Sequence, residues 1–308
     1  MKRLSWLAVL SVFVFVSCSD VDEAPVRGRR VGRYPGTRIE TQLRLRSMRD
    51  QLVKQNEELE AWRQKREQDL AAARLTQQSL IPPKPPTLPG WEVAALYRPV
   101  IQVGGDIYGW LRLGDDRILF WIADATGHGA AAALLTTLAK LLFHHASVEN
   151  EAPAEIMRLV DRDFRSILGA RCFMTAMCVA LNPTTGAASI VGAGHPPLLV
   201  ARRSGETESI ASSSPPLGLV SRSSFTETPL QLAAGDLFLL YTDGLYGSAN
   251  GAHRRLTPSS LAKRLHSASG SAESLLHRLC REALPSGNGD IPADDIAALA
   301  VRRHPERN

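Results

Sequence analysis

Several aspartates stand beside glycines at the ends of apolar segments, where their side chains could hold a metal ion. Asp124 follows the apolar run 117–123, and glycines at 127 and 129 come soon after it. Asp243 ends a second apolar run and precedes a glycine, while Asp106 follows a glycine pair. Carboxylates gathered at one edge of a sheet must be neutralised, and hard divalent cations such as Mg²⁺ and Mn²⁺ prefer such oxygen ligands.

A pair of acids near the C-terminus extends this pattern. Asp294 and Asp295 lead directly into the apolar run 296–301, which we predict to be the last strand. A single Asp-Gly pair is typical of a turn, and a single Asp-Asp pair is typical of a solvated loop. Because acids recur at four strand ends in one chain, the pattern favours a shared cation site.

Five motifs, taken in order, resemble those of the PPM-type metal-dependent serine/threonine phosphatases of the SpoIIE class: GGD (104–106), DATGHG (124–129), GAGHPPL (192–198), YTDG (241–244) and DDIA (294–297). The resemblance covers roughly Leu80 to Arg303, and the combination is far more specific than any one motif. The segment 80–100 is also similar to the lead-in of stress-response phosphatases that act in sigma-factor partner switching.

This resemblance implies a metal-activated water that attacks phosphoserine or phosphothreonine on a regulatory protein, such as an anti-sigma-factor antagonist. It implies Mn²⁺ or Mg²⁺ as the cofactor, with two ions in the site. By similarity, Asp124 bridges both ions, the backbone carbonyl of Ala125 is a further ligand, and Asp243 and Asp294 complete the set. Asp106 acts as a direct ligand or through a bound water.

Three further residues match family motifs without a settled role. His128 is a candidate general acid for the leaving oxygen, and a turn histidine packed on the helix start is an equal alternative. His195 has no ligand-like partner at short range and is interpreted as a structural or pocket-wall residue. Asp295 matches a position that is often non-ligating in relatives, so it is the second choice as a ligand.

The chain departs from the family pattern at three positions. Gly109 stands where relatives often have an aromatic residue and a second acid, Ala297 replaces a threonine, and Thr126 replaces a serine. None of these changes removes a predicted metal ligand, so an active phosphatase is the favoured interpretation. The alternative is a non-catalytic signalling module that uses the phosphatase fold as a binding platform.

Turn and helix signals predict an α+β fold. We expect two packed antiparallel β-sheets flanked by α-helices, a PPM phosphatase-like sandwich, preceded by a long N-terminal helix. Hairpin signals stand at 182–186, 204–206 and 234–236. Helices are expected at 130–146, 153–168, 257–267 and 271–284.

Composition excludes several other chemistries. The 308 residues are 44% hydrophobic, which is enough for a substantial core. The four cysteines form no C-x-x-C pair, and none has an arginine six positions on, which argues against a disulfide framework and a thiolate phosphatase. There is no G-x-x-x-x-G-K-[ST] phosphate loop, and we expect no nucleic-acid partner.

The N-terminal region combines an apolar run with basic residues. Residues 1–18 are predicted to be a signal peptide or a membrane anchor, and 19–37 a basic linker. Between positions 27 and 74 there are thirteen Lys/Arg against seven Asp/Glu, which favours a membrane-associated protein whose catalytic domain faces the cytoplasm. The alternative is an exported lipoprotein modified at Cys18.

Residues 38–80 carry apolar side chains at seven-residue steps, including Leu45, Leu52 and Leu59. This spacing predicts a coiled-coil-like linker that could pair two copies of the chain as a homodimer. A single amphipathic helix packed on its own domain is the alternative. Prolines from position 82 stop this helix, so the phosphatase domain is predicted to cover 81–304.

Overall fold

The computed structural model describes residues 35–100, 103–114, 116–127, 129–221, 223–246, 256–266, 270–284, 292 and 294–305. The predicted anchor at 1–18 and the Cys18 lipidation site lie outside these residues. The chain divides into two compact units, 1–60 and 61–308. Helix α1 runs from Pro35 to Leu80, which confirms the predicted long N-terminal helix, and it ends just before the proline-rich segment.

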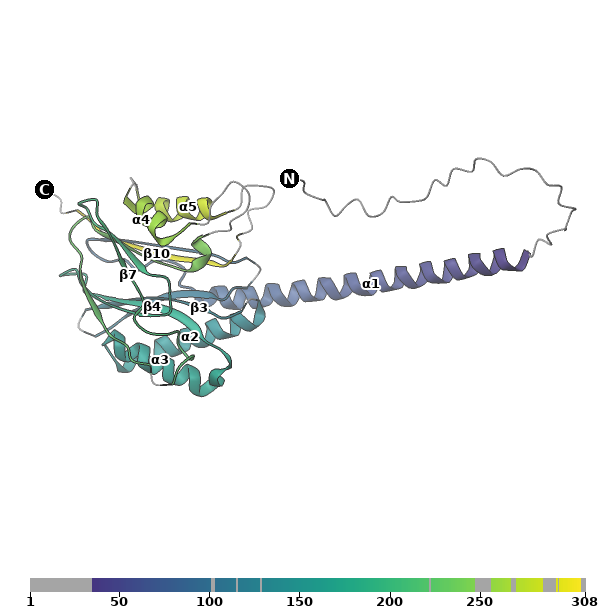
Figure 1. Cartoon of the computed structure of the whole chain (residues 1–308), viewed down its shortest axis with the longest axis horizontal. Coiled ribbons are helices and arrows are strands. Elements are labelled where there is room, and N and C mark those ends of the chain that lie inside the picture. The colour runs from purple at the N-terminus through teal and green to yellow at the C-terminus, as the bar shows by residue number, and fades with distance from the viewer. Residues whose placement is uncertain are drawn as a thin grey trace, which may run out of the picture. The chain divides into compact units, whose positions relative to one another are not determined.

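The strands of the described residues form two five-stranded antiparallel sheets. The prediction of two packed antiparallel sheets is confirmed, and Figure 1 shows them lying one above the other. The first sheet has the order β1-β10-β9-β6-β7, and the second has the order β2-β3-β4-β5-β8. The strands are β1 (Trp91–Arg98), β2 (Asp106–Arg112), β3 (Ile118–Ala125), β4 (Met174–Leu181), β5 (Ala187–Ala193), β6 (Leu198–Ala201), β7 (Thr207–Ile210), β8 (Thr228–Gln231), β9 (Leu237–Tyr241) and β10 (Ile296–Arg303).

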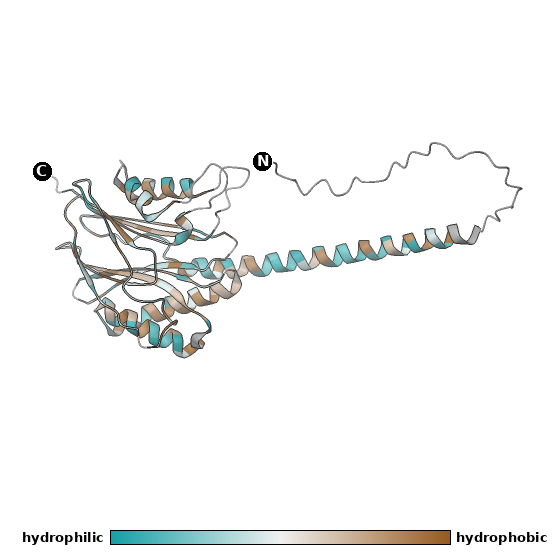
Figure 2. Cartoon of the chain, in the orientation of Figure 1, coloured by the Kyte–Doolittle hydropathy of each residue, from teal (hydrophilic) through white to brown (hydrophobic). Residues whose placement is uncertain are grey.

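Helices cover the outer faces of both sheets, so the domain has four layers. The second sheet is covered by α2 (Ala130–Glu149) and α3 (Pro153–Leu168), and the first by α4 (Pro258–His266) and α5 (Ala272–Ala283) (Figure 1). Short 3₁₀ helices span Gly169–Arg171 and Asp243–Tyr246. Hydrophobic residues concentrate in the strands and on the inner faces of these helices (Figure 2).

One of the three predicted hairpins is wrong. The turn at 234–236 exists, and the Asp236 N–H donates to the Ala233 carbonyl at 3.1 Å. However, β8 before this turn pairs with β5 in the second sheet, whereas β9 after it pairs with β6 and β10 in the first. The turn residues therefore mark a crossing between the two sheets rather than a hairpin.

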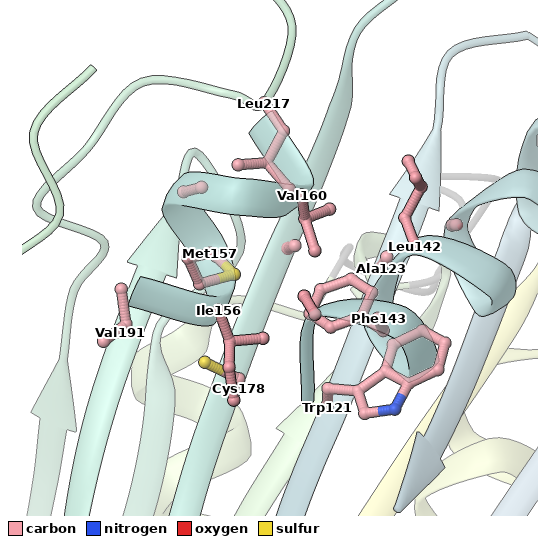
Figure 3. Packing of buried hydrophobic residues seen from close by; sticks show 14 of the residues in the cluster. Trp121, Ala123, Leu142, Phe143, Ile156, Met157, Val160, Cys178, Val191 and Leu217 are labelled. Atoms are coloured by element: carbon pink, nitrogen blue, oxygen red, sulfur yellow. The ribbon is translucent and has the colours of Figure 1, made fainter. Parts of the chain in front are cut away.

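The core between the second sheet and its helices is built around Trp121. Its ring stacks on Phe143 of α2 with centroids 4.3 Å apart, and both side chains are fully buried (Figure 3). Gly109 lies opposite Trp121 in the strand pair, and a Cβ there would stand 2.8 Å from the indole ring. The departure from the family pattern at Gly109 thus has a packing cause, because the indole fills the space that a side chain would need.

Helix α2 is apolar along most of its length. The segment Ala130–Val148 is long and apolar enough to cross a membrane by length and composition alone. In the fold, this helix packs through Phe143 and Ala139 on the second sheet. Its hydropathy is therefore that of a helix that contributes to a core.

Candidate metal centre

The structure brings five aspartates to one end of the sandwich. Asp106 opens β2 and lies directly opposite Asp124 at the end of β3. Asp243 follows the end of β9, while Asp294 and Asp295 precede β10, the strand that pairs with β9. Each sheet therefore contributes acids to the same edge, because β3 and β9 end there and β2 and β10 begin there.

A threonine that sequence reasoning did not single out joins the two sheets at this edge. The Thr242 hydroxyl donates to Oδ2 of Asp106 at 2.7 Å and accepts from the Ala297 N–H at 2.9 Å. Asp106 is only 3% exposed, so this bond orients a buried carboxylate. Ala297 contributes through its backbone, and its small side chain is fully buried next to the threonine that it supports.

Asp295 fixes the glycine-rich loop before Asp106. Its Oδ2 accepts from the Gly105 N–H at 2.6 Å, and its Oδ1 accepts from the Val100 N–H at 2.8 Å. Asp294, by contrast, is exposed. The two neighbouring acids therefore differ in burial: the buried Asp295 carboxylate accepts from two distant backbone N–H groups, whereas the exposed Asp294 carboxylate accepts from the N–H of Asp295 at 2.9 Å.

Close backbone approaches explain the glycines in two of the motifs. A Cβ on Gly105 would stand 2.8 Å from the carbonyl oxygen of Ala125, the oxygen that the resemblance assigns as a ligand. A Cβ on Gly244 would overlap the backbone of Asp295. Only glycine allows these segments to approach so closely, so both motifs are needed to bring the acids together.

The acids perturb one another electrostatically. The pKa of Asp124 is raised from 3.8 to about 7, first by burial and then by the charges of Asp243, Asp294 and Asp295. The pKa of Asp106 is raised well above its usual value by burial and by Asp124, and the hydrogen bond from Thr242 opposes this rise. Burial and mutual repulsion disfavour the charged form of these carboxylates, and a bound cation would offset both effects.

The acids are gathered but do not form a closed ligand set. Among the described residues, no group of three histidine, cysteine, aspartate or glutamate side chains is arranged to hold a metal ion as it stands. The donor types still fit Mn²⁺ or Mg²⁺, since all of them are hard oxygens. A pocket of about 830 Å³ beside Trp91 and Arg303 contains none of the aspartates, because it lies at the opposite end of β1 and β10.

Gln77, on the last turns of α1, contacts the glycine-rich loop directly. Its Nε2 donates to the Gly104 carbonyl at 2.7 Å and to the Thr136 hydroxyl at 2.8 Å, and its Oε1 accepts from the Gly104 N–H at 3.1 Å. The side chain is only 3% exposed. No feature of the sequence marks this glutamine among its polar neighbours, so it could not have been predicted.

The structure describes one of the two histidines that the sequence motifs contain. His195 is buried beside Thr175, which agrees with its interpretation as a structural residue. His128 lies outside the described residues, so its proposed role as a general acid stays a prediction.

Comparisons with known proteins agree with this fold and motif set. The sequence matches the family described as Stage II sporulation protein E (SpoIIE) over residues 114–304. It is 29% identical to the phosphoserine phosphatase RsbP of Bacillus subtilis over 158 residues, which cover 50% of this chain and 39% of RsbP. The chain spans about half or less of the length of the curated relatives that it matches.

Solved structures show the same architecture. The SiaA-PP2C domain of Pseudomonas aeruginosa superposes with a TM-score of 0.67 and 28% identity, covering 78% of this chain and 98% of that domain. The catalytic domain of the serine/threonine protein phosphatase PstP, solved in complex with 2 manganese ions, superposes with a TM-score of 0.51 at 16% identity, covering 69% and 97% of the two chains. The latter likeness shows the fold alone.

The two helix-flanked sheets with acids at one edge define a PP2C-type domain. Within that class, the chain belongs to the SpoIIE family, whose match covers more than half of its length.

Proposed function

We propose that this chain is a metal-dependent protein phosphatase that removes phosphate from serine or threonine of a regulatory protein. The observation that carries the proposal is the meeting of acids from both sheets, where Asp243 and Asp294 raise the pKa of Asp124. The family membership supports the same chemistry. The substrate that fits best is an anti-sigma-factor antagonist or a similar small domain, by likeness to the sigma-factor phosphatases that the motifs resemble.

The proposed ligands are the carboxylates of Asp106, Asp124, Asp243 and Asp294 and the backbone carbonyl of Ala125. Bound Mn²⁺ or Mg²⁺, as a pair of ions, would lower the pKa of a water and offset charge on the phosphoryl oxygens. Asp124 is the bridging candidate by similarity to the family, and its pKa responds to Asp243, Asp294 and Asp295 of the other sheet.

The chain's own residues prepare this site in two ways. Thr242 orients the Asp106 carboxylate through its hydroxyl. Asp295 and Gln77 hold the backbone of the loop 104–105, which sets the position where β2 begins. Holding these groups before substrate binds reduces the reorganisation that the reaction would otherwise require.

The direct test is phosphatase activity of the purified chain on p-nitrophenyl phosphate and on a phosphoserine peptide. We expect hydrolysis only with added Mn²⁺ or Mg²⁺, and loss of most of it in Asp124→Asn. Asp163→Asn is the matched control, since it removes one charge from α3 where Asp163 pairs with Arg162. Turnover in the presence of a chelator would refute the mechanism. A folded protein that binds no Mn²⁺ would instead favour the binding-platform alternative.

We further propose that residues 38–80 pair two copies of the chain. Large apolar side chains on α1 are exposed in the structure, among them Leu45 at 61%, Leu52 at 61% and Leu59 at 43%. Their seven-residue spacing suits a coiled-coil seam. Membrane association through residues 1–18, with the catalytic domain in the cytoplasm, is part of the same proposal and rests on the sequence. The proposed boundaries are 19–37 for the basic linker and 81–304 for the phosphatase domain.

A further inference from the structure

The motif that contains His195 forms a crossing between the two sheets. Strand β5 ends at Ala193 in the second sheet, and β6 begins at Leu198 in the first. In the segment between them, the His195 N–H donates to the Ser212 hydroxyl oxygen at 3.0 Å, and that hydroxyl donates to the His195 carbonyl at 2.9 Å. The backbone of His195 is thus fixed from both sides, which sets where its ring can lie.

The His195 ring lies close to β4, the strand that pairs with β3, and to the end of β9. Its Nδ1 is 2.8 Å from the hydroxyl of Thr175, and Thr175 is the cross-strand partner of Asp124. The ring also lies close to the backbone of Tyr241, the last residue of β9, which is followed by Thr242 and Asp243. One imidazole therefore lies against both sheets, next to the cross-strand partner of Asp124 in one sheet and two residues before Asp243 in the other.

The ring is neutral in this environment. His195 is only 5% exposed, and burial lowers its pKa to about 3, with the Tyr241 carbonyl opposing that shift. Its Nε2 meets no hydrogen-bond partner in the described part of the chain, although the Tyr241 carbonyl is close. A neutral, planar spacer can hold two strands apart without adding a positive charge that would compete with a cation.

We propose that His195, through Thr175 and the end of β9, is a positioning residue that fixes the separation of Asp124 and Asp243 and so sets the affinity of the site for Mn²⁺. This inference rests on the proposed function, because it assumes that the acids bind the ion. It goes further by giving the crossing motif a role in metal binding that packing alone does not imply.

The test is calorimetric titration of MnCl₂ into the full chain and its variants. Thr175→Val keeps the shape of the side chain but removes the hydroxyl that meets Nδ1, and His195→Ala removes the spacer. We expect Mn²⁺ to dissociate about 10- to 100-fold more readily from both variants, as is typical when a group that supports metal ligands is lost. Thr175→Ser keeps a hydroxyl and should restore most of the affinity lost in Thr175→Val.

A matched control separates positioning from general loss of stability. Leu232→Ala creates a cavity in the core between the sheets, where Leu232 is fully buried at the end remote from the acids. It should lower the unfolding temperature and leave Mn²⁺ affinity unchanged. Mn²⁺ binding by Thr175→Val as tight as that of the wild type would overturn the inference while leaving the proposed function intact. A wild-type chain that binds no Mn²⁺ would overturn both.

Discussion

Removing the charge of Asp124 should stabilise the metal-free protein. The same change should abolish the stabilisation that Mn²⁺ gives to the folded chain. The pKa of this carboxyl is raised from 3.8 to about 7 in the folded chain. Between these values the folded state holds a proton that the unfolded state has released, so stability falls as pH rises through this window. Asn carries no proton to lose, so Asp124→Asn should escape this loss.

The size of the effect follows from the shift. A rise from 3.8 to about 7 corresponds to at most about 4 kcal/mol. Asp124 is partly exposed and its acidic neighbours can readjust, so we expect a gain of about 2 kcal/mol after screening. The gain should be near zero at pH 4 and complete at pH 8, because only there is the wild-type carboxyl fully ionised.

Urea unfolding with EDTA at pH 4, 6 and 8 would measure this gain. With Mn²⁺ at about 100 times its dissociation constant, the wild type should gain about 2.7 kcal/mol. Asp124→Asn should gain little stability from Mn²⁺. The variant should therefore be more stable than the wild type in EDTA and less stable than it with Mn²⁺. Asp163→Asn should show neither effect, since Asp163 lies outside the acid cluster. An Asp124→Asn variant that is destabilised equally at pH 4 and pH 8 in EDTA would refute the electrostatic reasoning.

Three further predictions concern other parts of the chain. Gln77→Ala should weaken Mn²⁺ binding and lower the free energy of unfolding in urea by about 1–3 kcal/mol, because it leaves buried backbone groups of Gly104 unpaired. Gln78→Ala, at the exposed neighbouring position, should change neither quantity. Leu52→Lys should shift the chain from dimer to monomer in light scattering coupled to size exclusion, and an unchanged mass would contradict the proposed pairing. Gly109→Ala should lower the free energy of unfolding by about 1–3 kcal/mol through overpacking against Trp121, measured as a lower urea midpoint. Adding Trp121→Leu to the same chain should recover part of this loss.

The sequence predicted which acids share one edge, because side-chain type and the ends of apolar runs are local features. Asp106, Asp124 and Asp243 each adjoin a recognisable strand, so their common edge follows once the strands form sheets. Their assignment as ligands stays a prediction. The two sheets, the flanking helices and the long first helix are confirmed.

The groups that support these acids could not be predicted, because their contacts join distant parts of the chain. Gln77 reaches a loop 27 residues away, and the Asp295 carboxylate binds an N–H 190 residues away. The wrong hairpin at 234–236 has a similar cause. Turn residues act locally, whereas the choice of partner strand depends on which sheet can bury each strand.

The two ends of the sandwich are held together by different means. At the end away from the acids, the indole N–H of Trp91 donates to the Pro183 carbonyl at 2.8 Å, and Arg303 donates to the carbonyls of Thr185 and Leu232 at 3.1 and 2.8 Å. These bonds tie β1 and β10 to turns of the other sheet whether or not an ion is present. At the acid end, like charges face one another across the layers. Loss of the ion should therefore loosen the domain from one side only, with amide exchange rising around β3 and β9 before it rises near Trp91.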